Sequence, residues 1–281
     1  MSKETARHCL NRAISRASLA FLTAASVGLA AYKFYEDKVE APLNAEKCQL
    51  EKSLFFSPEI IDQIIKDLEE LKGFDVAIFF NTGGWGSTSL EEAPGWEQIL
   101  QGIQQNLTAK GYQPKIIECW RQEKLGEIID QTQPSPAAQK LAWRISLLTV
   151  YKPDLRVIVA GLSTGASLAE ETMCCLDSLP GAKGNDRILA IEAGRLLGGR
   201  KPLVSPHRTL SIANENDALV NGDLFHLIKR NLPPRVYWGE NGDVGLGKLR
   251  IDFTAPFHLY DWESISQEVG DFLDQKFPRR E

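Results

Sequence analysis

A serine stands between two glycines in the segment Gly161-Leu162-Ser163-Thr164-Gly165. The apolar, β-branched run at 156–160 before it is typical of a buried strand, and residues 164–178 after it are typical of a helix. In so tight a turn, side chains two residues on either side of the serine would collide with the adjoining elements, and glycine removes that collision. Ser163 would then be raised above the carboxyl edge of the sheet, where open α/β sheets bind ligands. The segment therefore predicts a serine nucleophile.

A serine nucleophile needs a general base, and the chain has four histidines. His8 lies in a basic N-terminal segment, His207 lies in a proline-containing loop, and His226 lies in the middle of a predicted helix. His258 lies in "TAPFHLYDW", a loop just before the last predicted helix. Because a base on a loop at the sheet edge can reach a serine at that edge, we predict that His258 is the base.

The base in turn needs an acid that holds its imidazole in the correct tautomer. Asp217, in "IANENDALV", follows the predicted strand at 209–215, between the serine and His258 in the sequence. We predict that Asp217 is this acid, with Glu192 at the end of the preceding strand as the alternative. An aspartate in "NEND" is also typical of a local turn in which its carboxylate binds the backbone.

The turn also supplies a group that could stabilise negative charge. Thr164 follows the serine and is the first residue of the predicted helix at 164–178. Backbone N–H groups at a helix N-terminus attract anions, and donors aimed at a developing oxyanion accelerate acyl transfer. We therefore predict that the N–H of Thr164 faces the place where an oxyanion would form.

Strands and helices alternate along the rest of the chain. Ser57 and Ser135, each followed by proline, predict two helix N-caps. The predicted strands cover residues 75–80, 115–120, 156–160, 187–193, 209–215 and 235–239, and the predicted helices cover residues 57–73, 94–110, 135–154, 164–178, 223–232 and 263–277. This alternation predicts an α/β fold, with a mostly parallel central sheet flanked by helices on both faces.

The composition narrows the class of protein. The chain has 281 residues, of which 43% are hydrophobic, and we expect residues 41–281 to form a single domain. With a net charge of −5 and no long basic run, we expect no nucleic-acid partner. The five cysteines include no C-x-x-C pair, and we expect the adjacent Cys174 and Cys175 to be small core residues.

The first 40 residues form a basic and apolar leader. Residues 17–32 carry no charge and follow Lys3, Arg7, Arg12 and Arg16. Residues 17–35 could form a signal-anchor helix, which would hold the domain at a membrane on its non-cytoplasmic side. The alternatives are a secretory signal peptide cleaved after Ala30 and a mitochondrial presequence, which would make the protein secreted or organellar.

Together these residues resemble the α/β-hydrolase family over about residues 74–277. The nucleophile motif of the family matches residues 161–165, and its order of serine, acid and histidine matches the three predicted residues. The resemblance also implies an oxyanion donor in "FFNTGGWG", where Gly84 or Trp85 is the expected donor and Gly83 the third matching position. Asn81 and Thr82 stand where the family often has histidine, and the helix at 57–73 stands in place of the two leading strands of the family.

The resemblance implies a serine hydrolase that cleaves a carboxylic ester of a small molecule or a lipid. Ser163 would attack the carbonyl with His258 as general base, and water would then hydrolyse the acyl-enzyme, with no metal or organic cofactor. The alternative is a non-catalytic, membrane-tethered binding protein on the same fold.

A nucleotide-binding function is disfavoured by a mismatch in its motif. Residues 242–248, "GDVGLGK", match the beginning of a phosphate-binding loop. Leu249 stands where that loop requires serine or threonine, and "LRIDF" after it is typical of a strand where the loop requires a helix.

Overall fold

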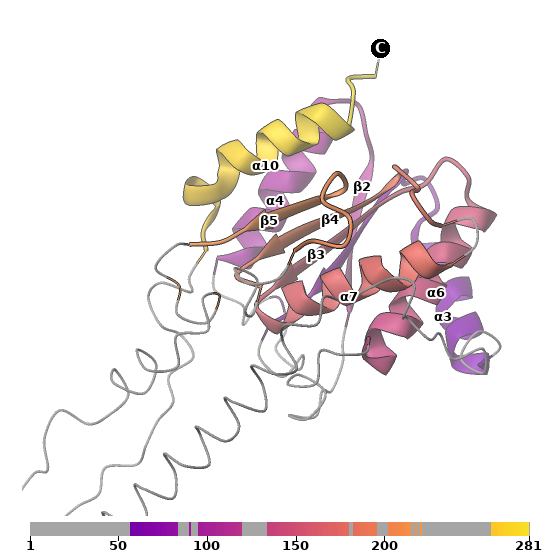
Figure 1. The fold of residues 1–281 in the computed structure, drawn as a ribbon. Helices are drawn as coiled ribbons and strands as arrows, with labels where there is room; N and C mark the ends of the chain where they lie inside the picture. The colour runs from indigo at the N-terminus through magenta and orange to yellow at the C-terminus, as the bar shows by residue number, and fades with distance from the viewer. Residues whose placement is uncertain are drawn as a thin grey trace, which may run out of the picture. The chain divides into compact units, whose positions relative to one another are not determined.

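A parallel β-sheet organises the part of the chain that the computed structural model describes, which comprises residues 57–83, 90, 95–119, 134–179, 182–195, 202–214, 217, 220 and 260–280 (Figure 1). The strands are β1 (Val76–Asn81), β2 (Pro114–Cys119), β3 (Arg156–Leu162), β4 (Ile188–Ala193) and β5 (Thr209–Ile212). The helices are α3 (Pro58–Glu70), α4 (Trp96–Ala109), α6 (Pro136–Tyr151), α7 (Thr164–Ser178) and α10 (Trp262–Lys276).

Within the described residues, the sheet has five strands in the order β2-β1-β3-β4-β5, and every paired strand is parallel. All residues of β1 and β4 are buried, which explains why these strands are continuous apolar runs. The predicted α/β class is confirmed. Strand β5 is shorter than the predicted 209–215, because its ladder with β4 ends at Ile212 and Gly194, at φ 61°, then turns the chain away from the sheet.

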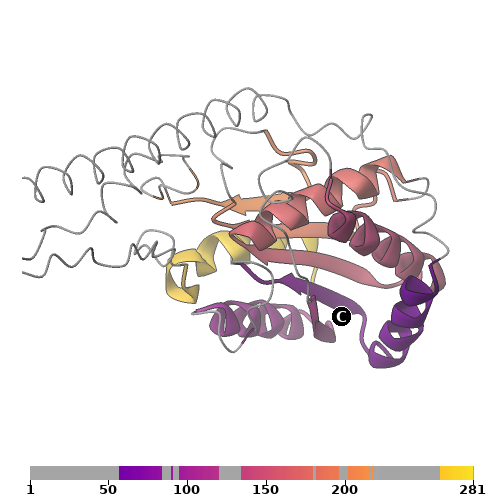
Figure 2. The same ribbon diagram turned by 90° about the horizontal axis from the view of Figure 1, so that it is seen from below.

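Helices cover both faces of this sheet (Figures 1 and 2). Helices α4 and α10 pack on one face, where Trp96 stacks on Phe80 with their ring centroids 5.0 Å apart. Helices α3, α6 and α7 pack on the other face around Phe79. Cys174 and Cys175 of α7 are buried, as the sequence predicted. The side chains of each strand alternate between the two apolar layers, so both layers are anchored in the same strands.

The two predicted serine caps are confirmed. The hydroxyl of Ser57 accepts from the N–H of Ile60 at 3.4 Å, and that of Ser135 accepts from the N–H of Ala138 at 3.3 Å. Each is followed by proline, which has no N–H to leave unpaired at the start of a helix. Helices α3 and α6 therefore begin where the sequence places them.

A buried ion pair joins α3 to α6. Asp67 of α3 is fully buried, and its Oδ1 accepts from Nη2 of Arg144 at 2.6 Å. The guanidinium carbon of Arg144 also lies 4.8 Å from the ring centroid of Phe79 in β1. This arginine is therefore held between α3 and the sheet, with its charge balanced by one carboxylate.

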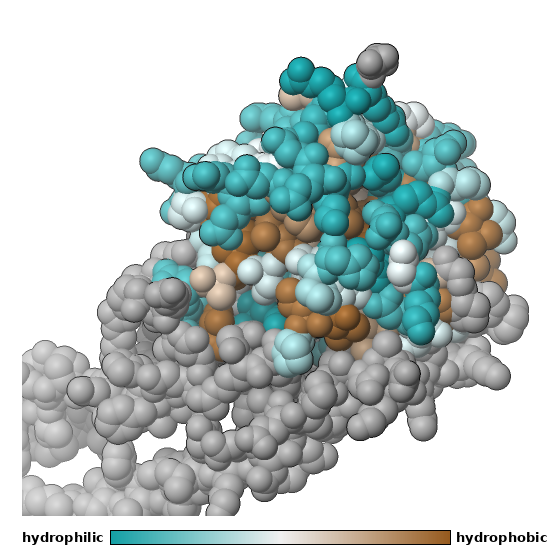
Figure 3. Space-filling model, turned by 45° about the horizontal axis from the view of Figure 1, so that its top comes forward, coloured by the Kyte–Doolittle hydropathy of each residue, from teal (hydrophilic) through white to brown (hydrophobic). Residues whose placement is uncertain are grey.

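Some of the predicted features lie outside the described residues. These are the leader at 1–40, the helix at 223–232, the strand at 235–239 and the loop at 242–248. No helix in the described ranges is both long enough and apolar enough to span a bilayer. The described surface that Figure 3 shows is mainly hydrophilic, with smaller apolar areas between the polar ones.

Removing the carboxylate of Asp67 tests the buried ion pair. We expect Asp67→Ala to lower the free energy of unfolding by ~3–5 kcal/mol, because it leaves the Arg144 guanidinium buried without its partner. The control is Lys66→Ala on the same helix, which removes an exposed pair with Glu70 at 3.7 Å and is expected to change stability by less than ~1 kcal/mol. Chemical denaturation measures both, and equal losses would contradict this account.

Candidate active site

Ser163 has a strained backbone between β3 and α7. Its φ of 57° and ψ of −118° make it the only non-glycine residue in the described ranges with a positive φ. Such a conformation costs ~1–3 kcal/mol and persists only where the surrounding structure imposes it. The N–H of Ser163 donates to the carbonyl of Ala193 at 2.9 Å, and its own carbonyl accepts from the N–H groups of Ala166 and Ser167, each at 3.1 Å. The strain is therefore held by backbone bonds to β4 and α7.

The side chain of Ser163 does not cap the helix that it precedes. Ser57 and Ser135 occupy the same position before α3 and α6, and both accept a backbone N–H with their hydroxyls. Ser163 makes no such bond, and its side chain is only half-buried. The sequence alone allowed an ordinary capping serine here, and the geometry of the turn excludes that role.

The two flanking positions, 161 and 165, have no room for a side chain. A Cβ on Gly161 would lie 2.2 Å from the carbonyl oxygen of Gly165, and a Cβ on Gly165 would lie 2.0 Å from that of Asn81. Both distances are far below any real contact between these atoms, and both close atoms belong to the backbone. The predicted reason for glycine at these positions is therefore confirmed.

The loop that follows β1 lies beside the serine. A Cβ on Gly83 would lie 3.2 Å from Cβ of Ser163 and 3.0 Å from the carbonyl oxygen of Leu162. The amide of Asn81 donates to the carbonyl of Ala160 at 3.2 Å, which ties the end of β1 to β3. The start of the glycine-rich loop and the serine turn are therefore neighbours.

The serine turn lies at the point in the sheet where the chain stops adding strands on one side of β1 and starts adding them on the other. From β1 the chain crosses to β2 on one side and then to β3 on the other, so the segments after β1 and β3 leave toward opposite faces. Open parallel sheets bind ligands at such a switch point, outside the carboxyl ends of the strands. Ser163 follows β3 and Gly83 follows β1, so both residues border this position.

The predicted oxyanion donors are described in part. Thr164 is buried and is the first residue of α7, directly after Ser163. Gly84 and Trp85 lie outside the described residues, and so does His258. The roles of these four residues therefore stay predictions.

Asp217, the predicted acid, is buried after β5 at the carboxyl end of the sheet. Its Oδ1 accepts from the N–H of Val220 at 3.3 Å, which is the kind of local bond that its sequence context suggested. Its Oδ2 accepts from the hydroxyl of Tyr260 at 2.9 Å, 43 positions along the chain. No motif in the sequence indicates a role for Tyr260, apart from its place two residues after His258.

Glu192, the alternative acid, has other partners. It is fully buried in β4, and Nε of Arg195 lies 3.6 Å from its Oε2. Arg195 also lies 3.4 Å from Oε1 of Glu170 in α7. Burial, followed by the charge of Glu170, raises the pKa of Glu192 well above its usual range. The two glutamates and the arginine form a buried cluster between β4 and α7.

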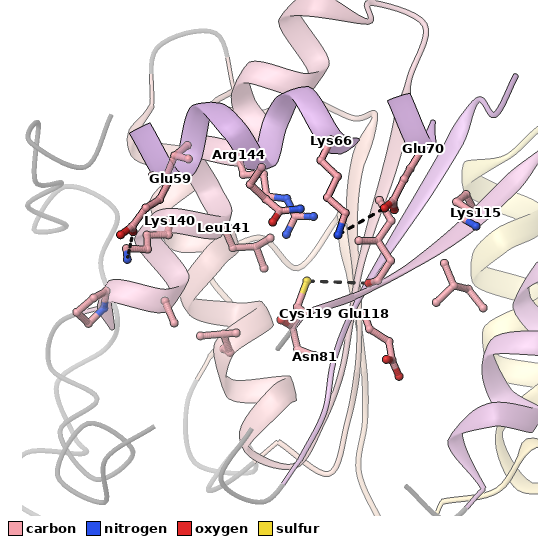
Figure 4. Close-up of a pocket in the computed structure, with 17 residues that line it drawn as sticks. Glu59, Lys66, Glu70, Asn81, Lys115, Glu118, Cys119, Lys140, Leu141 and Arg144 are labelled. Atoms are coloured by element: carbon pink, nitrogen blue, oxygen red, sulfur yellow. Dashed lines mark hydrogen bonds and ion pairs between the residues drawn. The ribbon is translucent and has the colours of Figure 1, made fainter. Parts of the chain in front are cut away.

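A cavity of about 860 Å³ lies beside β2, between α3 and α6 (Figure 4). Ser163 is not among its lining residues. Two ion pairs stand at its rim, with Lys140 3.6 Å from Glu59 and Lys66 3.7 Å from Glu70. Its charged lining residues include members of both signs, and none of them is a nucleophile at a strained turn, so the serine turn is the stronger candidate site.

No protein-family model matches the sequence, and no curated protein sequence is significantly similar to it. Among solved structures, the chain is similar to a Trichoderma reesei cutinase in complex with a phosphonate inhibitor, with a TM-score of 0.45 and 14% identity over 78% of this chain and 87% of that chain. It is also similar to a cutinase-like protein from Cryptococcus sp., with a TM-score of 0.41 and 13% identity over 73% of this chain and 95% of that chain.

A methyl group at position 165 tests the crowding around the turn. We expect Gly165→Ala to lower the free energy of unfolding by at least ~1–3 kcal/mol, because the carbonyl of Asn81 occupies the space of the new Cβ. The control is Gly270→Ala in α10, where the nearest atom lies 4.0 Å away and stability is expected to rise by up to ~1 kcal/mol. Thermal and chemical denaturation measure both, and a tolerated Gly165→Ala would contradict the crowding.

The buried Glu192 predicts a stability that depends on pH. Its folded pKa lies well above its ordinary value of 4.5, so the folded chain keeps a proton that the unfolded chain loses. The free energy of unfolding therefore falls as the pH rises from 4.5 through the raised pKa. We expect Glu192→Gln, which stays neutral, to abolish this fall and to exceed the wild type in stability above the raised pKa.

Denaturation curves recorded at several pH values measure this difference. The control is Glu268→Gln on the exposed face of α10, which is expected to follow the wild type at every pH. If the wild type and Glu192→Gln showed the same pH dependence, the proposed protonation of Glu192 would be wrong.

Proposed function

We propose that this chain is a serine hydrolase that cleaves a carboxylic ester through an acyl-enzyme. The observation that carries the proposal is the backbone of Ser163, which is held at positive φ between two glycines while its side chain caps no helix. Strain of this kind is typical of functional sites, and a strand-nucleophile-helix turn exposes a hydroxyl at the sheet edge. Its place at the switch point of the sheet supports the same function.

The mechanism assigns one role to each predicted residue. Ser163 attacks the ester carbonyl while His258 takes its proton and later gives it to the leaving alcohol. Asp217 holds the imidazole in the tautomer that can accept that proton. Water, activated by the same histidine, then releases the acid from the acyl-enzyme.

The developing oxyanion is stabilised at the mouth of the turn. The N–H of Thr164 lies at the start of α7, and the loop that begins at Gly83 supplies the second donor from Gly84 or Trp85. The proximity of Gly83 to Ser163 supports this assignment. Loss of one such donor typically lowers kcat by ~10²–10³-fold.

The proposed substrate is an ester of a small molecule or a lipid. Residues 17–35 would hold the domain at a membrane on its non-cytoplasmic side, where lipophilic esters concentrate. A secreted or organellar protein, without that anchor, is the alternative location, and neither changes the chemistry proposed for Ser163.

Labelling with a fluorophosphonate tests the nucleophile directly. We expect the wild type to be labelled and Ser163→Ala to stay unlabelled, because only an activated serine reacts with the phosphorus centre. The matched control is Ser167→Ala, which removes a serine one turn further along α7 and is expected to label like the wild type.

Ester hydrolysis completes the test of the triad. We expect Ser163→Ala and His258→Ala each to lower kcat on p-nitrophenyl esters by several orders of magnitude, with no further loss in the double variant. A folded wild type that is neither labelled nor active on esters of any chain length would instead favour the non-catalytic binding protein.

A further inference from the structure

We propose that Tyr260 is a positioning residue for the acid of this site, and that it joins the Asp217 carboxylate to the segment that carries His258. The proposal rests on the proposed function, because it assigns a role within the same triad. It adds a residue that no sequence motif indicated. Tyr260 acts through Asp217, with no contact to the substrate required.

The hydroxyl of Tyr260 makes two hydrogen bonds in the loop after β5. It donates to Oδ2 of Asp217 at 2.9 Å and accepts from the N–H of Asn214 at 3.1 Å. Asn214 and Asp217 are themselves joined, because the N–H of Asp217 donates to the carbonyl of Asn214 at 2.9 Å. One phenol therefore bridges both ends of the turn that presents the acid.

Tyr260 itself is held firmly. Its ring is 5% exposed and belongs to the apolar layer between the sheet, α4 and α10. Its carbonyl oxygen lies so close to Gly95 that a Cβ there would be 2.7 Å away. Asp261, the next residue, caps α10 by accepting from the N–H of Ser264 at 2.8 Å. The hydroxyl is therefore aimed by a fixed ring and a fixed backbone.

The protonation of Tyr260 suits a donor. Burial, opposed in part by the N–H of Asn214 and reinforced by the charge of Asp217, raises the pKa of the phenol above its ordinary value. The phenol therefore stays protonated at neutral pH, and it donates to the carboxylate. The hydrogen bond from this neutral donor holds Oδ2 of Asp217 in place.

The same tyrosine lies two positions after His258 in the sequence. Two residues of extended chain span at most about 7 Å, so an anchor at Tyr260 limits how far the predicted base can lie from it. The bonds from Val220 and Tyr260 reach different oxygens of the carboxylate, Oδ1 and Oδ2, and together they fix its orientation.

Tyr112 offers a matched control for loss of a buried phenol hydroxyl. It is 2% exposed and belongs to the same apolar layer as Tyr260. Its hydroxyl donates to the carbonyl of Pro278 at 3.0 Å. Tyr112 precedes the first residue of β2, so it lies at the opposite end of the sheet from Asp217. Tyr112→Phe therefore removes a comparable bond without touching the acid.

The experiment compares Tyr260→Phe with Tyr112→Phe in the full chain, using a p-nitrophenyl ester. Labelling of wild-type Ser163 by a fluorophosphonate first tests the proposed function. A wild type that is not labelled would contradict the proposed function itself, which distinguishes that failure from a failure of the role of Tyr260. We expect Tyr260→Phe to lower kcat by about 10- to 100-fold, the factor that one hydrogen bond to a charged group represents. We expect KM to stay within about twofold, because the proposed role of the tyrosine is exerted through Asp217 and leaves ground-state binding intact.

The pH profile separates positioning from packing. Without the hydrogen bond from the phenol, the Asp217 carboxylate interacts more strongly with the protonated imidazole. The pKa of the base, measured from the pH dependence of kcat/KM, is therefore expected to rise. Tyr112→Phe is expected to leave kcat, KM and the profile unchanged. Asp217→Asn and Tyr260→Phe are expected to combine non-additively, because both act through one carboxylate.

Three outcomes would overturn the proposal. These are an unchanged kcat and pH profile in Tyr260→Phe, an equal loss in Tyr112→Phe, or fully additive losses with Asp217→Asn. If Tyr260→Phe fails to fold, 3-fluorotyrosine placed at position 260 keeps the hydroxyl and makes it a stronger donor. The pKa of the base in kcat/KM is then expected to fall, and an unmoved profile overturns the proposal.

Discussion

The close approach of α7 to the ends of β1 and β3 is the constraint on which the candidate site depends. Gly165 faces the carbonyl of Asn81, and Gly161 faces the carbonyl of Gly165, with no room for a methyl group at either place. This contact brings the first turn of α7 over the sheet edge and leaves one residue to reverse the chain. Ser163 is that residue, and its positive φ is a backbone conformation that residues other than glycine rarely adopt.

The parallel sheet then gathers the other groups around this turn. Strands that run in one direction end at one edge, so the loop after β1 and the acid after β5 share that edge with the serine. The place of β1 between β2 and β3 makes its carboxyl end one border of the switch point. The site therefore follows from strand order and from one crowded turn, and few side chains are needed to shape it.

Local features were the ones that the sequence predicted well. The serine caps at 57 and 135, the glycine at 161 and the place of Asp217 after a strand depend on neighbours within a few residues. The glycine at 165 was indicated by its spacing from the serine, although the backbone that crowds it belongs to Asn81. Tyr260, the Asp67–Arg144 pair and the cluster around Glu192 depend on segments far apart in the chain, which no spacing reveals. The roles of His258, Gly84 and Trp85 stay predictions, because these residues lie outside the described ranges.

The bond between Ser163 and β4 has a consequence for how a pH dependence at the candidate site is interpreted. The carbonyl that holds the serine belongs to Ala193, the residue directly after Glu192. A carboxyl group that becomes charged in that buried position repels Glu170 across the α7 interface, and it does so one residue before the carbonyl that holds Ser163. A change at the serine turn as the pH rises through that raised pKa would then reflect ionisation within the scaffold.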